Sequence, residues 1–232
     1  MRRTVTPELL DRDAGTAQEI AESLADLRRI NRWFGGVRVV EKLVRRVGDG
    51  ARHLTWLDVA SASGDIVEMV ERRLAREGVA VKAVALDRAA SHLPATLPAV
   101  QGDALALPFA DGSFDVVSAS LLVHHLEPDE VRRFAGEALR VCRRAVILND
   151  LRRSWTHLAL VYAGMPLYRS RLTRHDGVAS VKQAYTESEL RAMLTGLAAR
   201  VEVERFYLCR MGAVLWKEQQ SAISSWQLAV RD

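Results

Sequence analysis

A run of small residues at positions 58–65, with the sequence DVASASGD, lies between a predicted buried strand and a predicted helix. Small side chains let a ligand approach the backbone closely, and the first turn of a helix offers free N–H groups to an anion. The run is therefore predicted to bind a ligand. Its candidate binding residues are Asp58, Ala60, Ser61, Gly64 and Asp65.

Acidic residues follow the next two predicted strands. Asp87 ends the second strand, where a carboxylate can accept two hydrogen bonds from the hydroxyls of a ribose. Asp103 follows the third strand, where its carboxylate can accept a hydrogen bond from the exocyclic amine of adenine while Leu105 lies against the ring. These positions predict a nucleoside-binding edge, to which the neighbouring Arg88 and Ala104 also belong.

Two histidines, His124 and His125, follow the fourth predicted strand, which ends at Ser120. Histidine can act as a general base near neutral pH, so this pair is predicted to take a proton from a phenol or an enol. A structural role, in which one ring bonds to the backbone, is the alternative for each histidine. Ser120 is predicted to face the same ligand as the small-residue run.

Further candidates follow the fifth predicted strand. Asp150 ends that strand and is predicted to orient an acceptor or a histidine, or else to cap the next helix. His175 lies in a basic segment, 169–177, that is predicted to be a loop closing over the substrate. Arg171 and Arg174 of this loop would then pair with a carboxylate or a phosphate, although an ordinary turn is also compatible with the segment.

The elements that must position these residues alternate between strand and helix. Residues 7–48 are predicted to form two helices, broken at residues 34–36. Five strands are then predicted, with helices between them, at 53–60, 79–87, 99–103, 114–120 and 145–149. This alternation is typical of a parallel sheet covered by helices on both faces. After an irregular segment at 151–185, a capping box at Thr186 begins a helix, and 201–209 and 212–216 are predicted to form a hairpin.

Composition limits the protein class. The chain has 232 residues, 49% of them hydrophobic, with a formal net charge of +4, which is typical of one globular domain. Arginines are interspersed with acids along most of the chain, so the sequence does not indicate a nucleic-acid partner. The two cysteines have no metal-ligand spacing, which predicts no metal site and a cytoplasmic location. No secretion signal or membrane span is predicted.

Over residues 53–150 the sequence resembles the class I S-adenosylmethionine-dependent methyltransferases. The small-residue run matches the glycine-rich motif of the family, Asp87 its ribose-binding acid and Asp103 its adenine-side acid. Phe114-Asp115 and the VHHL stretch at 123–126 match two further motifs in the same order. Within the family, the chain is most similar to the small-molecule branch, which includes quinone C-methyltransferases and enzymes of secondary metabolism.

The resemblance implies a three-layer Rossmann-like α/β fold, with a mostly parallel seven-stranded sheet whose last strand is antiparallel. It implies S-adenosylmethionine as the cofactor and O- or C-methylation of a phenolic, polyketide or quinone-like acceptor. It divides a single methyltransferase domain into a helical cap at 1–50, a cofactor-binding core at 53–150, a substrate-side insertion at 151–185 and a C-terminal helix and hairpin at 186–232.

The N-terminal helices of such enzymes cover the cofactor, so Asn31, Arg32 and Trp33 are expected to reach its methionine end. An ordinary helix turn, with Trp33 packed in the core, is the alternative. The sequence departs from the family at Ala60 and Ala62, where glycine is usual. A methyl group at Ala62 disfavours a positive φ, which would weaken cofactor binding if the loop requires that conformation.

Three other functions are compatible with parts of the sequence. A methyltransferase-like scaffold without cofactor is suggested by Ala62, and an RNA or protein methyltransferase by the surplus of arginine. A dinucleotide oxidoreductase would also use Asp87, but its glycine motif is absent. The sequence leaves open the acceptor, the methylated atom and the oligomeric state.

Overall fold

The structure is a computed structural model that describes residues 1–206 and 209–218. Its centre is a seven-stranded sheet in the order β3-β2-β1-β4-β5-β7-β6. The strands are β1 (His53–Val59), β2 (Ala80–Asp87), β3 (Ala99–Gln101), β4 (Phe114–Ser120), β5 (Cys142–Leu151), β6 (Arg200–Phe206) and β7 (Arg210–Trp216). β7 runs antiparallel to both of its neighbours, β5 and β6, and the pairs formed by β1 to β5 are parallel. The predicted methyltransferase-type sheet is therefore confirmed.

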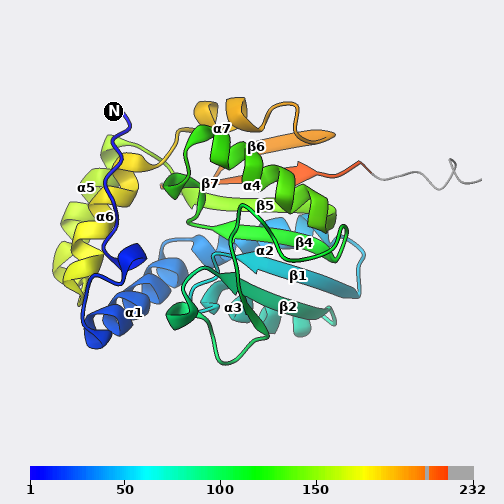
Figure 1. The fold of residues 1–232 in the computed structure, drawn as a ribbon, viewed down its shortest axis with the longest axis horizontal. Helices are drawn as coiled ribbons and strands as arrows, with labels where there is room; N and C mark the ends of the chain where they lie inside the picture. The colour runs from blue at the N-terminus through cyan, green and yellow to red at the C-terminus, as the bar shows by residue number, and fades with distance from the viewer. Residues whose placement is uncertain (207–208, 219–232) are drawn as a thin grey trace, which may run out of the picture.

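Helices cover both faces of this sheet (Figure 1). The helices are α1 (Ala17–Trp33), α2 (Gly36–Val47), α3 (Asp65–Ala75), α4 (Pro128–Val141), α5 (Trp155–Gly164), α6 (Arg171–Gln183) and α7 (Glu187–Leu194). One hydrophobic core lies between the sheet and α2 and α3, and a second lies between the sheet and α4 and α7. The fold is thus the three-layer arrangement that the sequence predicts.

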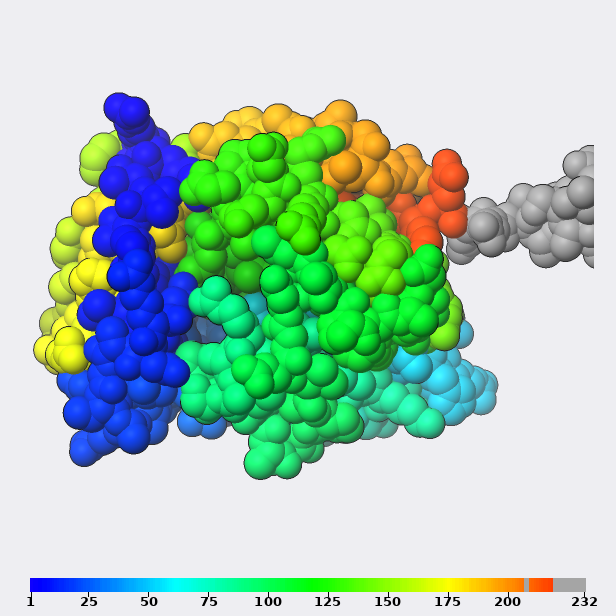
Figure 2. Space-filling model, viewed as in Figure 1, coloured from blue at the N-terminus to red at the C-terminus, as the bar shows by residue number. Residues whose placement is uncertain are grey.

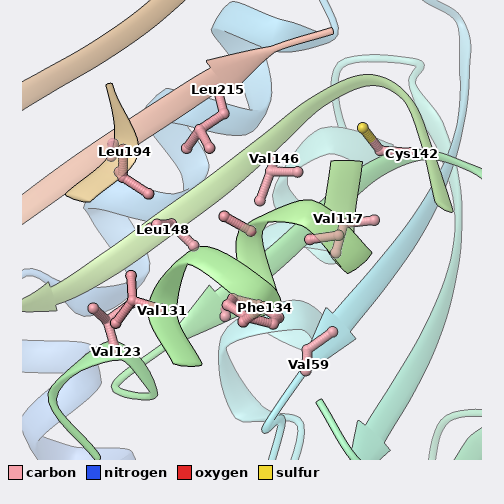
Figure 3. Close-up of a cluster of buried hydrophobic side chains, with 14 of the residues drawn as sticks. Val59, Val117, Val123, Val131, Phe134, Cys142, Val146, Leu148, Leu194 and Leu215 are labelled. Carbon is pink, nitrogen blue, oxygen red and sulfur yellow. The ribbon is translucent and has the colours of Figure 1, made fainter. Parts of the chain in front are cut away.

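The core under α4 illustrates how the sequence specifies this packing (Figure 3). Val131, Phe134, Ala138 and Val141 recur at helical spacing and are all buried against the sheet. A capping box formed by the side chains of Glu127 and Glu130 begins the helix, with a proline in its first turn. The helix therefore fixes the loop that precedes it, and that loop carries the two histidines.

The parallel strands point toward one end of the molecule, where α1, α5, α6 and the N-terminal segment, residues 1–16, lie together (Figure 1). The strand order reverses between β1 and β4, which is where open α/β sheets bind ligands. No helix among the described residues is long and apolar enough to cross a membrane.

Two predicted elements are wrong. The basic segment at 169–177 is helical from Arg171 onward, because Ser170 caps α6 and Gly177 lets the helix pack closely on Val161 of α5. Residues 7–16 do not begin the first helix, which starts at Ala17 behind a capping box formed by Thr16 and Glu19. The expected strand at 201–209 ends at Phe206, and residues 207 and 208 lie outside the described part of the chain.

Candidate active site

A cavity of about 970 Å³ lies between the strand ends and the helices beyond them. The surface is hollowed between the N-terminal segment, in dark blue, and the green central part of the chain (Figure 2). Most of the residues predicted from the sequence line this cavity. They are Asp58, Ala60, Ser61, Asp65, Asp87, Arg88, Asp103, Ala104, Leu105, Ser120, His124 and His125.

Four predicted site residues do not line the cavity. Gly64 lies behind the loop, where an added Cβ would come within 3.0 Å of Pro94. Arg32 is exposed, with its guanidinium 5.6 Å from the ring of Trp33. His175 is half-exposed beside Asp176, and Asp150 is buried behind His124. The structure therefore does not bring Arg32 and His175 to the other candidates.

The loop after β1 has a backbone suited to glycine at three positions. The φ angles of Ala60, Ala62 and Gly64 are 56°, 45° and 69°, all in the left-handed region. The Ala62 N–H donates to the Asp87 carboxylate at 2.9 Å, and the Ala89 N–H donates to its other oxygen at 3.0 Å. Asp87 thus fixes the loop in this strained conformation, and each of its oxygens retains a lone pair for a ligand.

Replacing Ala62 by glycine should relieve this strain. The left-handed conformation costs alanine about 1–2 kcal/mol, whereas glycine adds entropy to the unfolded chain, so we expect the free energy of unfolding to rise by zero to about 1 kcal/mol. Ala192→Gly, on the exposed face of α7, should instead lower it by about 0.5–1 kcal/mol. Urea denaturation of both variants tests this expectation, which fails if Ala62→Gly lowers the free energy of unfolding as much as Ala192→Gly does.

Two carboxylates, the buried Asp58 and the partly buried Asp65, lie on the cavity beside this loop. Asp58 is 3% exposed and accepts a hydrogen bond from Ser118, and burial raises its pKa to about 6. Burial also raises the pKa of Asp65, which accepts hydrogen bonds from Ser63 at 3.2 Å and Asn31 at 3.4 Å. Neither carboxylate forms a salt bridge within the described residues, so a cationic group on a ligand would be favoured here.

The adenine-side and strand-end candidates have simpler surroundings. Asp103 is exposed, and one of its oxygens accepts a hydrogen bond from the Leu105 N–H at 2.9 Å. Ser120 is buried, and its hydroxyl accepts a hydrogen bond from the Asn149 amide at 3.2 Å. Ser61 is also buried, and its hydroxyl has no partner among the described residues. A polar ligand in the cavity would satisfy Ser61.

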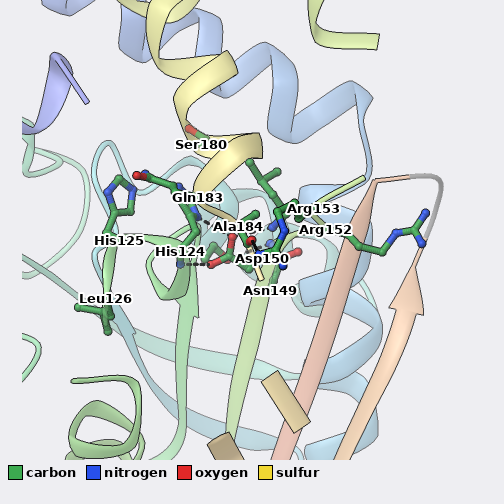
Figure 4. A network of polar contacts seen from close by, with 12 residues as sticks. His124, His125, Leu126, Asn149, Asp150, Arg152, Arg153, Ser180, Gln183 and Ala184 are labelled. Carbon is green, nitrogen blue, oxygen red and sulfur yellow. Dashed lines mark hydrogen bonds and ion pairs between the residues drawn. The ribbon is translucent and has the colours of Figure 1, made fainter. Parts of the chain in front are cut away.

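The two histidines lie on the loop after β4, beneath α6 (Figure 4). Their ring centroids are 4.1 Å apart. Nδ1 of His124 is 2.6 Å from an oxygen of Asp150, and its Nε2 is 3.5 Å from an oxygen of Glu8. Nδ1 of His125 is 2.8 Å from an oxygen of Asp11. Each histidine is therefore oriented by a carboxylate at Nδ1.

His124 is charged at neutral pH because of these neighbours. Burial alone would lower its pKa, but the carboxylates of Asp150 and Glu8 outweigh burial and raise the pKa of His124 to about 10. Burial likewise opposes the charge of Asp150, but the His124 imidazolium holds the pKa of that carboxyl below its usual range. Ser154 caps the next helix, so the alternative role of Asp150 as a helix cap is wrong.

The N-terminal segment supplies two acids that sequence reasoning missed. Glu8 is buried and accepts hydrogen bonds from Ser180 at 2.6 Å and Gln183 at 2.8 Å. Asp11 is half-exposed and lies beside His125. The spacing of three residues in the sequence PELLD, which directs both acids to one side of a helical turn, is the only signal that could have indicated them.

Asp176 of α6 anchors this N-terminal segment. Its two oxygens accept hydrogen bonds from the N–H groups of Leu9 and Leu10, at 2.8 and 3.0 Å. His175 Nδ1 lies 2.8 Å from the same carboxylate. His175 is thus part of the contact that holds the acids over the cavity, rather than a group facing a ligand.

Trp33 is 70% exposed, so its alternative placement in the core is wrong.

Comparison with known proteins finds one family match over part of the chain and a shared fold. Residues 57–148 match a sequence family described as a methyltransferase domain. No curated protein matches the chain. Several solved structures share its fold at 12–17% sequence identity.

The plantazolicin methyltransferase BpumL, in complex with a monoazolic desmethylPZN analogue and SAH, has a TM-score of 0.61 at 12% identity, covering 86% of this chain and 91% of its own. A SAM-dependent methyltransferase from Aquifex aeolicus has a TM-score of 0.55 at 17% identity, covering 77% and 89%. Magnesium protoporphyrin IX methyltransferase from Synechocystis has a TM-score of 0.53 at 13% identity, covering 79% and 82%. The domain match at 57–148 and this shared fold thus make the chain similar to the S-adenosylmethionine-dependent methyltransferases.

Proposed function

We propose that this enzyme methylates an oxygen or an activated carbon of a small phenolic, polyketide or quinone-like molecule, as a step of secondary metabolism in the cytoplasm. The observation that carries the proposal is the pair His124 and His125, each oriented by a carboxylate, in the same cavity as the nucleoside-binding edge. A plantazolicin methyltransferase and a pyocyanin biosynthetic protein among the structures of similar fold support a natural-product acceptor.

The residues around the cavity fit S-adenosylmethionine. Asp87 would accept hydrogen bonds from its ribose, and Asp103 from its adenine, at the edge where both line the cavity. The carboxylates of Asp58 and Asp65 would meet its ammonium group, and the Ser61 hydroxyl would gain the partner that it lacks. When bound, the cofactor supplies an activated methyl group and a good leaving group.

Apolar side chains line the part of the cavity that we assign to the acceptor. Leu27, Ile30, Val161 and Leu167 line it, from α1, α5 and the turn that follows α5. Such walls exclude water and hold an aromatic or aliphatic acceptor by its apolar surface. The histidine pair and the acids of the N-terminal segment line the same cavity.

His125 is the group that takes the proton in this proposal. Asp11 holds its Nδ1, so that Nε2 receives the proton of the acceptor O–H or activated C–H. The His124 imidazolium, fixed between Asp150 and Glu8, stabilises the phenolate or enolate that remains. With S-adenosylmethionine bound, the oxygen or carbon of that anion would be the nucleophile for the activated methyl group that the cofactor supplies. His124 itself holds its proton throughout.

The charge of His124 can be measured directly. We expect its Cε1–H resonance, followed by NMR from pH 6 to 8.5, to show no titration, because the pKa of His124 is raised from 6.5 to about 10. The contribution of this shift to folding free energy is complete below pH 6.5 and is lost as the pH rises through 10. Asp150→Asn should bring the midpoint down into the measured range. A wild-type midpoint near 6.5 would contradict the assignment.

A methyl-transfer assay tests the function itself. The untagged full chain is incubated with S-adenosylmethionine carrying a tritiated methyl group and a panel of phenols, naphthols and 1,3-diketones, and the label is sought in the products. We expect label in the acceptors that ionise most easily. Label that enters added RNA or protein, with none in any small molecule, would overturn the proposal.

The assay also includes an arm with EDTA. Glu8, His124 and His125 have donor atoms within 4.8 Å of one another, which is close enough for a metal ion. A proton-transfer role for His125 predicts that EDTA leaves the activity unchanged. Loss of activity with EDTA would contradict that role.

A further inference from the structure

Arg210 is a buried cation that the proposed chemistry has not used. It is the first residue of β7, where it pairs with Leu151 at the ligand-binding end of β5. It is 2% exposed and lines the cavity. Within the described residues its Nη1 has no hydrogen-bond partner, and the guanidinium forms no salt bridge with a carboxylate.

Such an arrangement is unfavourable in the absence of a ligand. A buried charge loses its hydration, and only a hydrogen-bonded counter-charge compensates the loss. Burial lowers the pKa of Arg210 to about 10, which leaves the guanidinium charged at neutral pH. Because a guanidinium has donors and no acceptor, the group that completes this site must be an acceptor, and a carboxylate matches its planar pair of donors.

Asn31 keeps Arg210 from pairing with a carboxylate of the protein. Arg210 Nη2 donates to the Asn31 side-chain oxygen at 3.0 Å, and the Asn31 amide nitrogen donates to Asp65 at 3.4 Å. The neutral amide thus lies between the buried guanidinium and the partly buried carboxylate. Both charges stay available on the cavity wall, one for an anion and one for a cation.

We propose that Arg210 binds the carboxylate of a ligand in this cavity, with Asp65 facing the ammonium group of a zwitterion. The inference rests on the proposed function for the ligand: the amino-acid end of the cofactor carries both charges, and the loop beside Asp65 is where that end would lie. A carboxylate on the acceptor has the same chemistry, and the experiment distinguishes the two sources. Arg32, which was expected from the sequence to reach the methionine end of the cofactor, is exposed and outside the cavity.

The test compares two ligands that differ in the amino-acid end. S-adenosylhomocysteine and 5′-deoxy-5′-methylthioadenosine share the thionucleoside, and only the first has the carboxylate and ammonium groups. Isothermal titration of the untagged full chain with each ligand is carried out for wild type, Arg210→Gln, Arg210→Lys and the control Arg32→Gln. We expect Arg210→Gln to weaken S-adenosylhomocysteine about 10- to 100-fold and to leave methylthioadenosine unchanged. Arg210→Lys should recover part of the loss, and Arg32→Gln should match wild type.

The melting temperature of the ligand-free protein separates binding from a structural role. A guanidinium without a counter-charge does not stabilise the fold, so Arg210→Gln should melt no lower than wild type. A lower melting temperature together with equal loss of both ligands would overturn the proposal, because the arginine would then be holding the fold.

An acceptor carboxylate gives a different pattern. In this case wild type and Arg210→Gln bind S-adenosylhomocysteine equally, and 4-hydroxybenzoate should raise the melting temperature of the wild type alone. The methyl ester of 4-hydroxybenzoate should raise the melting temperature of neither protein. That outcome supports Arg210 as the carboxylate site and assigns the carboxylate to the acceptor. If neither S-adenosylhomocysteine nor 4-hydroxybenzoate distinguishes the two proteins, the proposal is wrong. Failure of wild type to bind either nucleoside would instead count against the proposed function, and the 4-hydroxybenzoate comparison would still decide the role of Arg210.

Discussion

Replacement of His125 by alanine is expected to lower kcat by about 10²- to 10⁴-fold, which is the usual contribution of a positioned general base. The affinity for S-adenosylhomocysteine should stay the same, because the strand ends that would hold the nucleoside do not include this ring. Initial rates measured with the best acceptor from the panel, together with titration of S-adenosylhomocysteine, check both parts. Asp11→Asn, which removes the charge beside Nδ1, should reduce kcat in the same direction.

His53→Ala is the matched control for this substitution. His53 is exposed at the start of β1 and does not line the cavity, so its loss should leave kcat close to that of wild type. A His125→Ala enzyme with full activity would exclude His125 as the base. Activity lost together with cofactor affinity would instead indicate that the ring supports the shape of the cavity.

The second large effect is expected at Asp87. Its carboxylate holds the backbone of Ala62 and faces the cavity, so Asp87→Ala removes both a ligand acceptor and the support of the loop. Loss of one or two charge-assisted hydrogen bonds, at about 1.5–3 kcal/mol each, should weaken S-adenosylhomocysteine at least tenfold. Isothermal titration measures this change.

Asp87→Asn separates the two roles of the side chain, because an amide oxygen can still accept the Ala62 N–H while the charge is lost. It should weaken binding by less than Asp87→Ala. Asp49→Ala, at an exposed position far along the chain from the nucleoside edge, is the control and should bind as wild type does. Unchanged affinity in Asp87→Ala would contradict the assignment of this edge.

The cofactor side of the site could be predicted because its signals are local. Asp87 and Asp103 each follow a strand that is recognisable from a few neighbouring residues, and the parallel arrangement brings such strand ends to one edge. The positive φ values of Ala60 and Ala62 also agree with the expectation that this loop suits glycine. The structure adds the physical reason, which is the hydrogen bond from Ala62 to Asp87.

The acceptor side could not be predicted because its contacts join distant parts of the chain. Glu8 meets Ser180 and Gln183 across more than 170 positions, and Arg210 meets Asn31 across 179. No periodicity or motif in the sequence indicates a contact between residues so far apart in the chain. The sequence therefore indicated Arg32 and His175, which carry suitable groups but do not line the cavity.

The helix at 171–183 shows a second limit of local signals. Arginines, a histidine and Gly177 are typical of a surface loop, and these residues were predicted to form one. The Ser170 cap and the close approach of Gly177 to Val161 stabilise a helix instead. This helix carries Asp176, Ser180 and Gln183, so the support of Glu8 depends on an element whose type the sequence did not reveal.

Thermal melting with S-adenosylhomocysteine, and separately with NAD, tests the central claim most directly. A ligand at one hundred times its dissociation constant adds about 2.7 kcal/mol to the stability of the fold, which for a chain of this size raises the melting temperature by roughly 5–11 °C. Stabilisation by S-adenosylhomocysteine alone is the predicted result. Stabilisation by NAD alone, or by neither ligand, would contradict the assignment of this cavity to a methyltransferase cofactor.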